Sequence, residues 1–208
     1  LRSSSAASDV YKRQFQYYSK FKNISVAVDK KRRRGINKLI DYGVNLIILD
    51  DAFQHRKVIP TYSLLLSDYS NLYFNDYLLP RGSLRESKKG SKRADSIVIT
   101  KCPENFSQSD KNYLIDRVKL SSNQHIFFSK IKYSKVLYSS SDTLNIMKLS
   151  NKKVNVVTGI VNSEVLISFL EDRNITVQHF KYPDHFDYKE KDILKFMDNI
   201  TITTEKDY

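Results

Sequence analysis

The chain has 208 residues, of which 40% are hydrophobic. No apolar run approaches the roughly 18 residues of a membrane-spanning helix, and the length suits one domain or one domain with a smaller lobe. Thirty-five Lys and Arg against 23 Asp and Glu give a net charge of +12, which indicates an anionic partner: nucleic acid, nucleotide phosphates or an acidic membrane surface. The single cysteine, Cys102, excludes a disulfide framework and a Cys-rich zinc site, and favours the reducing cytosol.

The two ends of the chain have an unusual composition. Residues 1–14 begin without Met, have no hydrophobic periodicity, and resemble the adapter-derived leader of a translated sequencing read. We expect this segment to be non-native. The other end stops directly after the apolar run 200–204, with no closing helix. We therefore expect the chain to be a fragment of a longer protein.

Short apolar runs recur along the chain and are typical of strands covered on both faces of a parallel sheet. They occupy residues 44–49, 63–66, 96–100, 126–128, 154–158, 175–177 and 200–204. Helical spacing of apolar residues separates several of them, at 36–43, 113–120 and 165–170. Strands that alternate with helices predict an α/β fold with a mainly parallel sheet. The polar stretch 133–151 is the best candidate for a junction between two lobes.

The most hydrophobic run, 44–49, ends at Asp50 and Asp51. Ligands of open α/β sheets bind at the carboxyl ends of the strands, and a Walker-B-type aspartate in that position holds Mg²⁺ in phosphoryl-transfer enzymes. Carboxylate oxygens are hard ligands that suit Mg²⁺. The alternative interpretation is an ordinary strand-to-loop turn, in which Asp is common.

Two polar segments follow the acidic pair. The first carries an amide, an imidazole and a guanidinium at Gln54, His55 and Arg56, and this combination indicates a site more than any member alone. The second is a Pro- and Gly-bracketed turn that presents Arg85 and Glu86. Arginine suits two-pronged binding of phosphate, whereas the alternative for this turn is a loop with surface charges.

These segments resemble the tetraacyldisaccharide 4′-kinase family, the lipid A 4′-kinases of Gram-negative bacteria. Five motifs of that family occur in order, and together with Arg32 they make the resemblance span residues 24–207. The motifs stand at residues 50–55, 79–86, 93–101, 183–186 and 203–207. Three positions depart from the family pattern: Ala52 replaces Gly, and Arg81 and Ser83 replace Ala and Pro.

The resemblance implies a P-loop-kinase core at residues 15–133 and a smaller C-terminal α/β lobe at 134–208. It implies transfer of the ATP γ-phosphoryl group, with Mg²⁺, to the 4′-hydroxyl of a tetraacylated glucosamine disaccharide 1-phosphate, a lipid A precursor. The enzyme would work in the cytoplasm at the surface of the inner membrane, where its basic residues would meet acidic lipid. No nucleic-acid partner is implied.

The resemblance also assigns roles to individual residues. Asp50 and Asp51 would act in catalysis and hold Mg²⁺, and His185 would deprotonate or orient the acceptor hydroxyl. The phosphate and acceptor side would be lined by Gln54, His55, Arg85, Glu86 and Arg32. Lys101 and Lys206 are weaker candidates for anion contacts, whereas His125 and His179 have the pattern of structural residues.

None of the five glycines opens the Gly-x-x-x-x-Gly-Lys-Ser/Thr sequence with which a P-loop holds phosphates. The chain on its own is therefore expected to be inactive. Two alternatives remain at this point. A basic, Tyr- and Phe-rich chain is compatible with a nucleic-acid-binding module, and Asp50, Asp51, His55 and His185 are compatible with a metal-dependent phosphoester hydrolase.

Overall fold

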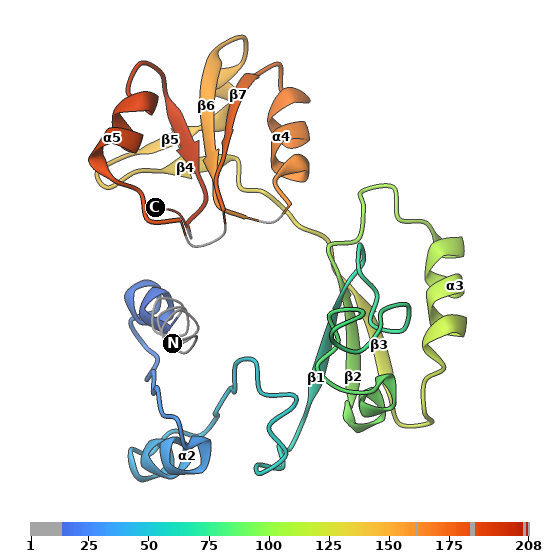
Figure 1. Cartoon of the computed structure of the whole chain (residues 1–208). Helices are drawn as coiled ribbons and strands as arrows, with labels where there is room; N and C mark the ends of the chain where they lie inside the picture. Colours follow the sequence, from blue (N-terminus) through green and yellow to red (C-terminus); the bar gives the residue numbers. More distant parts are fainter. Residues whose placement is uncertain (1–13, 161, 184–185, 206, 208) are drawn as a thin grey trace. The chain divides into compact units, whose positions relative to one another are not determined.

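The computed structural model describes residues 14–160, 162–183, 186–205 and 207. The chain divides into two compact units, Leu1–Ile131 and Lys132–Tyr208 (Figure 1). Each unit contains a three-stranded parallel sheet. This arrangement confirms the predicted mixed α/β class with parallel sheets.

The sheet of the first unit has the order β1-β2-β3, formed by Leu64–Asp68, Ser96–Thr100 and His125–Phe128. The central strand β2 is covered on both faces, and Ile97 and Ile99 are fully buried. Helix α3 (Gln108–Val118) packs on this sheet with its buried apolar side chains. The remaining elements of the unit are a helix at residues 14–20, α2 (Arg32–Asp41) and η1 (Lys88–Arg93).

The strand expected at residues 44–49 is not formed, and this prediction was wrong. Leu46 and Ile48 have exposed fractions of 79% and 85%. A strand forms only where a neighbour pairs with its N–H and C=O groups, and no strand among the described residues pairs with this segment. On the same evidence β1 is an edge strand, because it pairs with β2 alone, and Leu64 and Leu66 are exposed on it.

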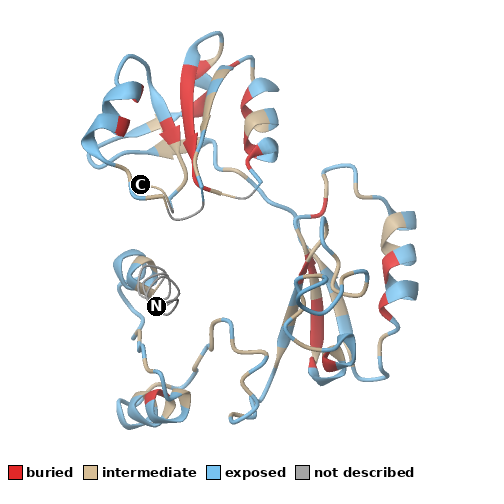
Figure 2. Ribbon diagram, viewed as in Figure 1, coloured by how far each residue is buried: buried red, intermediate tan, exposed pale blue. Residues whose placement is uncertain are grey.

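The second unit places β6 (Lys153–Thr158) between β7 (Thr176–Lys181) and β8 (Thr201–Thr203), all parallel. Figure 2 shows that burial is concentrated on the central strand of each sheet. The other elements are β4 (Val136–Tyr138) and β5 (Thr143–Asn145), which pair antiparallel, η2 (Ile146–Leu149), α4 (Glu164–Glu171), α5 (Glu190–Ile193) and η3 (Leu194–Phe196).

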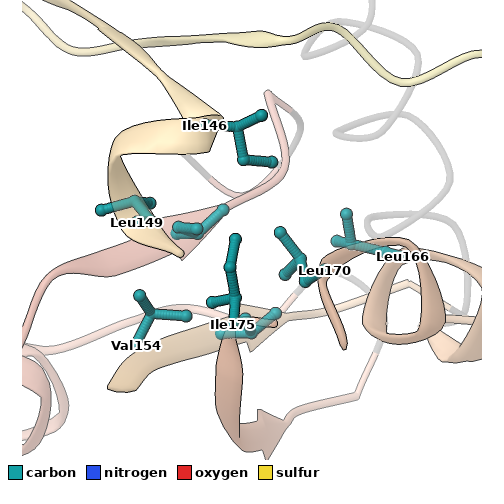
Figure 3. Packing of buried hydrophobic residues seen from close by; sticks show 8 residues of the cluster. Ile146, Leu149, Val154, Leu166, Leu170 and Ile175 are labelled. Atoms are coloured by element: carbon teal, nitrogen blue, oxygen red, sulfur yellow. The ribbon is translucent and has the colours of Figure 1, made fainter. Parts of the chain in front are cut away.

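The core of this second unit joins η2, β6 and α4. Ile146, Leu149, Val154, Leu170 and Ile175 are almost completely buried and point toward one another (Figure 3). Residues 133–151, which the polar composition suggests as a junction, therefore contribute to this core. Many of their polar residues lie in and around the short antiparallel strands β4 and β5, which are largely exposed.

Replacing the fully buried Leu170 by Ala should destabilise the protein by roughly 2–5 kcal/mol, because the change removes buried methyl groups and leaves a cavity. Val165→Ala on the exposed side of the same helix is the control, and its effect should stay below about 1 kcal/mol. Urea unfolding followed by circular dichroism measures both. Equal losses for the two variants would contradict the packing described for α4.

Candidate functional site

The backbone of the acidic pair is held by Arg32, the first residue of α2. The Arg32 guanidinium donates from Nη1 to the Asp50 carbonyl oxygen at 3.0 Å and from Nη2 to the Asp51 carbonyl oxygen at 3.1 Å. Asp51 has a left-handed backbone conformation, with φ of +46°. Arg32, which the resemblance assigns to phosphate, therefore contacts the loop that carries the acidic pair.

The Asp51 carboxylate forms an ion pair with Arg85. The Arg85 Nη1 atom lies 3.2 Å from Asp51 Oδ2, and the two side chains are 65% and 60% exposed. Ion pairs with this exposure contribute at most about 1 kcal/mol to stability, since water screens both charges. Either side chain can therefore leave this pair at small cost. The guanidinium can then bind an anion, and the carboxylate can bind a cation.

Glu86 joins the loop after the acidic pair to the region before β2. Its Oε1 atom accepts from Arg93 Nη2 at 2.7 Å, and its Oε2 atom accepts from Arg56 Nη2 at 3.1 Å. The Arg93 guanidinium also lies over the Phe53 ring at 4.8 Å and donates to the Phe53 carbonyl oxygen at 3.2 Å. The contact with Arg93, together with that with Arg56, holds the pKa of Glu86 below its ordinary value although partial burial acts to raise it.

Gly90 leaves room for the ion pair between Glu86 and Arg93. A Cβ atom built on Gly90 would lie 2.9 Å from Arg93 Nη1 and 2.9 Å from Glu86 Oε2. A residue with a Cβ atom at position 90 would require the ends of these two side chains to shift. The close packing of Glu86 and Arg93 around position 90 therefore favours a glycine there.

A cavity of about 60 Å³ lies beside this network. Gln54, Arg85 and Glu86 line it, with Phe53 and Tyr73 among the aromatic walls. The volume accommodates about two water molecules, which is much less than a nucleotide. His55 is on the same loop, where its backbone N–H donates to the Ala52 carbonyl oxygen at 2.8 Å.

The structure thus brings together predicted residues from the two segments. They are Asp51, Gln54, Arg85 and Glu86, with Arg32 bound to the backbone of Asp50 and Asp51. His55 lies on the same loop as Gln54, and its side chain is not among these contacts. Lys101 lies elsewhere, at the end of β2, where its Nζ atom is 2.5 Å from Asp68 Oδ2. His185 and Lys206 fall outside the described residues, so their assignment stays a prediction.

Sequence reasoning missed Arg93 as a member of the site and gave Arg56 no role. Arg93 is the first residue of the Arg-Ala-Asp motif, and that motif was the available signal. Two of the residues that depart from the family pattern make local contacts. Arg81 lies over the Tyr77 ring at 4.3 Å, and the Ser83 hydroxyl donates to the Asp76 carboxylate.

The acidic pair has the ligand chemistry of a magnesium site. Mg²⁺ usually takes one or two protein carboxylates and completes its shell with waters and substrate phosphates. Over the part of the chain that the structure describes, no group of three or more His, Cys, Asp or Glu side chains is arranged to hold a metal ion.

The Glu86 contact gives a pH-dependent prediction. Because the folded-state pKa is lowered, the stabilisation is present above the ordinary Glu pKa of about 4.3 and is lost as pH falls through the lower folded value. Glu86→Gln should therefore be less stable than the unmodified protein by roughly 1 kcal/mol at neutral pH, and the difference should vanish in acid. Thermal unfolding at several pH values measures it.

The matched control is Glu104→Gln. Glu104 is 89% exposed and lies 3.7 Å from Lys130, so its replacement should leave the stability unchanged at every pH. A Glu86→Gln variant whose stability follows the control would refute the two-arginine contact.

A comparison with protein families matches residues 9–208 to the model described as tetraacyldisaccharide-1-P 4′-kinase. Curated relatives named tetraacyldisaccharide 4′-kinase include those of Flavobacterium psychrophilum, 39% identical over 202 residues, Flavobacterium johnsoniae, 36% over 200, and Bacteroides thetaiotaomicron, 33% over 215. Each alignment covers 93% of this chain.

The chain spans 57–58% of the length of these three relatives. No solved structure matches it. The match to the family model extends over almost the whole chain, and it includes the loop with the acidic pair and the turn that ends in Arg85 and Glu86. The chain therefore belongs to the tetraacyldisaccharide-1-phosphate 4′-kinase family.

Proposed function

We propose that the enzyme containing this chain transfers the γ-phosphoryl group of ATP to the 4′-hydroxyl of tetraacyldisaccharide 1-phosphate, a step in lipid A biosynthesis. Family membership supports the reaction class, and it favours a kinase over the nucleic-acid module and the metal-dependent hydrolase. The observation that carries the proposal is the Asp50–Asp51 loop, which Arg32 holds at two backbone carbonyls beside Arg85.

In this reaction the acceptor 4′-oxygen bonds to the γ-phosphorus, the bond from that phosphorus to the leaving oxygen of ADP breaks, and the hydroxyl proton passes to a base. We assign the base to His185, because histidine is the side chain that most often acts as a general base. Asp50 and Asp51 would hold Mg²⁺, which neutralises charge on the transferring group. Arg85, freed from Asp51, would bind a phosphate.

The remaining predicted residues would act around this centre. Gln54 lines the small cavity and His55 is on the same loop, and we propose that both face the phosphate and acceptor side. Glu86 is held between Arg56 and Arg93. Its proposed contribution on that side is to keep the loop and the Arg85 turn at a fixed separation.

Asp51→Asn and Asp50→Asn should each lower kcat by roughly 100-fold or more, since each removes a charge from the proposed Mg²⁺ site. Asp41→Asn, an exposed carboxylate on α2, is the matched control and should leave kcat unchanged. The assay follows transfer of labelled phosphate from ATP to the disaccharide in the full-length enzyme. Unaltered kcat in both variants would rule out the metal site, and phosphoester turnover without ATP would indicate the hydrolase.

We also propose that the 208-residue chain alone is inactive, because no part of its sequence is a P-loop. The genomic reading frame upstream of Phe15 tests this directly. A P-loop encoded in frame would identify the missing phosphate-binding segment, and the full-length protein, in contrast to the chain, should phosphorylate the disaccharide. Activity of the chain by itself would contradict the proposal.

We propose further that the enzyme works in the cytoplasm, peripheral to the inner membrane. Phe15, Tyr18 and Phe21 are exposed at the helix of residues 14–20 and directly after it, and Lys20 and Lys22 accompany them. Aromatic rings with lysines suit the interface of an acidic bilayer. Within the described residues, no helix has the length and apolar character needed to cross a membrane.

The double variant Lys20→Gln/Lys22→Gln should bind vesicles of phosphatidylglycerol and phosphatidylcholine more weakly, by about 1 kcal/mol for each lysine. The control replaces the exposed Lys148 and Lys152 of the second unit by Gln. Sedimentation with vesicles at low and high salt measures the affinity. Equal binding of both double variants would contradict this surface, and tighter binding to RNA than to vesicles would favour a nucleic-acid partner.

A further inference from the structure

The backbone around Arg93 is bound to residues that precede two strands of the first-unit sheet. The Ser63 hydroxyl, directly before β1, donates to the Arg93 carbonyl oxygen at 2.8 Å. The side-chain amide of Gln124, directly before β3, donates to the carbonyl oxygens of Ser91 at 2.9 Å and Ala94 at 2.7 Å. The end of η1 is therefore fixed to the amino ends of β1 and β3 before the chain enters β2.

The Arg93 side chain connects two segments that are far apart in the sequence, the loop of residues 50–56 and the turn of residues 79–86. Its Nη2 atom donates to the Phe53 carbonyl oxygen of the loop and to Glu86 Oε1 of the turn, and the guanidinium lies over the Phe53 ring. A guanidinium presents its N–H donors in a rigid plane. One side chain therefore holds the loop and the turn in a fixed relation.

The two residues that Arg93 contacts are close in sequence to two predicted site residues. Phe53 is two positions after Asp51, and Glu86 directly follows Arg85. The Asp51–Arg85 ion pair is mostly exposed and contributes little by itself, whereas the Glu86 carboxylate that Arg93 binds is only 19% exposed. The separation of Asp51 from Arg85 therefore depends more on Arg93 than on their own attraction.

Arg56 provides a second and weaker link to Glu86. Its side chain is 69% exposed, and it belongs to the same loop as Phe53. Arg93 differs because its own backbone is anchored to the residues before β1 and β3. Of the two arginines on Glu86, Arg93 is therefore the one that relates the loop and the turn to the sheet.

We propose that Arg93 is a positioning residue for phosphoryl transfer: its guanidinium joins the loop that carries Asp51 to the turn that carries Arg85, and its backbone joins both to the sheet. In this role Arg93 contacts neither ATP nor the acceptor. It sets the separation of the Asp51 carboxylate and the Arg85 guanidinium, and catalysis is sensitive to small displacements of such groups. This inference rests on the function proposed above.

The first test measures kcat in the full-length enzyme with Arg93→Ala and Arg93→Lys. Arg93→Ala should lower kcat by roughly 10- to 100-fold, because a small misplacement of a catalytic group has effects of this size. Arg93→Lys should fall between, since an ammonium group can still pair with Glu86 but lacks the planar fork that also reaches Phe53. Lys92→Ala is the matched control, because it removes an exposed positive charge from the same helix, and it should leave kcat unchanged.

A double-variant experiment separates positioning from a general loss of stability. Glu86→Gln is measured alone and together with Arg93→Ala, and circular dichroism gives the folded fraction of each enzyme. If both residues act through one link, the double variant should lower kcat no further than the more damaging single variant. Independent losses would multiply, and multiplied losses would contradict the link.

The second test needs no catalysis and uses the 208-residue chain. The sequence has no tryptophan, so Phe53→Trp places a single indole beneath the Arg93 guanidinium. Adding Arg93→Ala should shift the indole emission to longer wavelength and increase its quenching by acrylamide, because the face of the ring loses its cover. Adding Lys92→Ala should change neither.

The outcomes distinguish the two proposals. An unaltered kcat in Arg93→Ala, or an equal loss in Lys92→Ala, would overturn the inference while leaving the proposed function in place. If the unmodified full-length protein transfers no phosphoryl group to the disaccharide, the proposed function fails. The indole emission would then still decide whether Arg93 holds the loop, and an emission that Arg93→Ala leaves unchanged would exclude it.

Discussion

The constraint on which the rest of the structure depends is the burial of a central parallel strand on both faces. β2 and β6 each have neighbours on two sides, and most of their side chains are buried. The polar side chains on β6, Asn155 and Thr158, are buried and bonded within the fold. Chemistry is therefore displaced to the strand ends and to the loops. Lys101 with Asp68 in the first unit, and Asp207 with Gly159 in the second, illustrate this at the carboxyl ends.

The arginine side chains near the candidate site are paired with acceptor groups of the protein. Although the chain has a net charge of +12, the arginines beside the candidate site are each engaged by a carboxylate or a carbonyl. Glu86 is the best protected of these carboxylates, at 19% exposure. These contacts hold a loop with several cations in a defined geometry, and the exposed Arg85–Asp51 pair is the least protected of them.

The elements that sequence reasoning predicted correctly are those whose signals are local. β2, α3 and α4 follow from an apolar run or a helical spacing that depends only on neighbouring residues. Residues 44–49 are an equally apolar run. A strand also needs a neighbouring strand to pair with, and the pattern of apolar residues along the chain gives no information about that neighbour. For the candidate site, the motifs predicted Asp51, Arg85 and Glu86, and the roles of these residues stay predictions. The ion pairs of Glu86 with Arg56 and Arg93 join residues 30 and 7 positions apart, which no spacing rule describes.

The open edge of β1 has a practical consequence. Its exposed leucines accompany a row of backbone N–H and C=O groups that pair with no other strand among the described residues. Such an edge is a template onto which another extended chain can add. In the described part of the 208-residue polypeptide, β1 is therefore the place where an extended segment of another chain could join the sheet of the first unit by backbone hydrogen bonds.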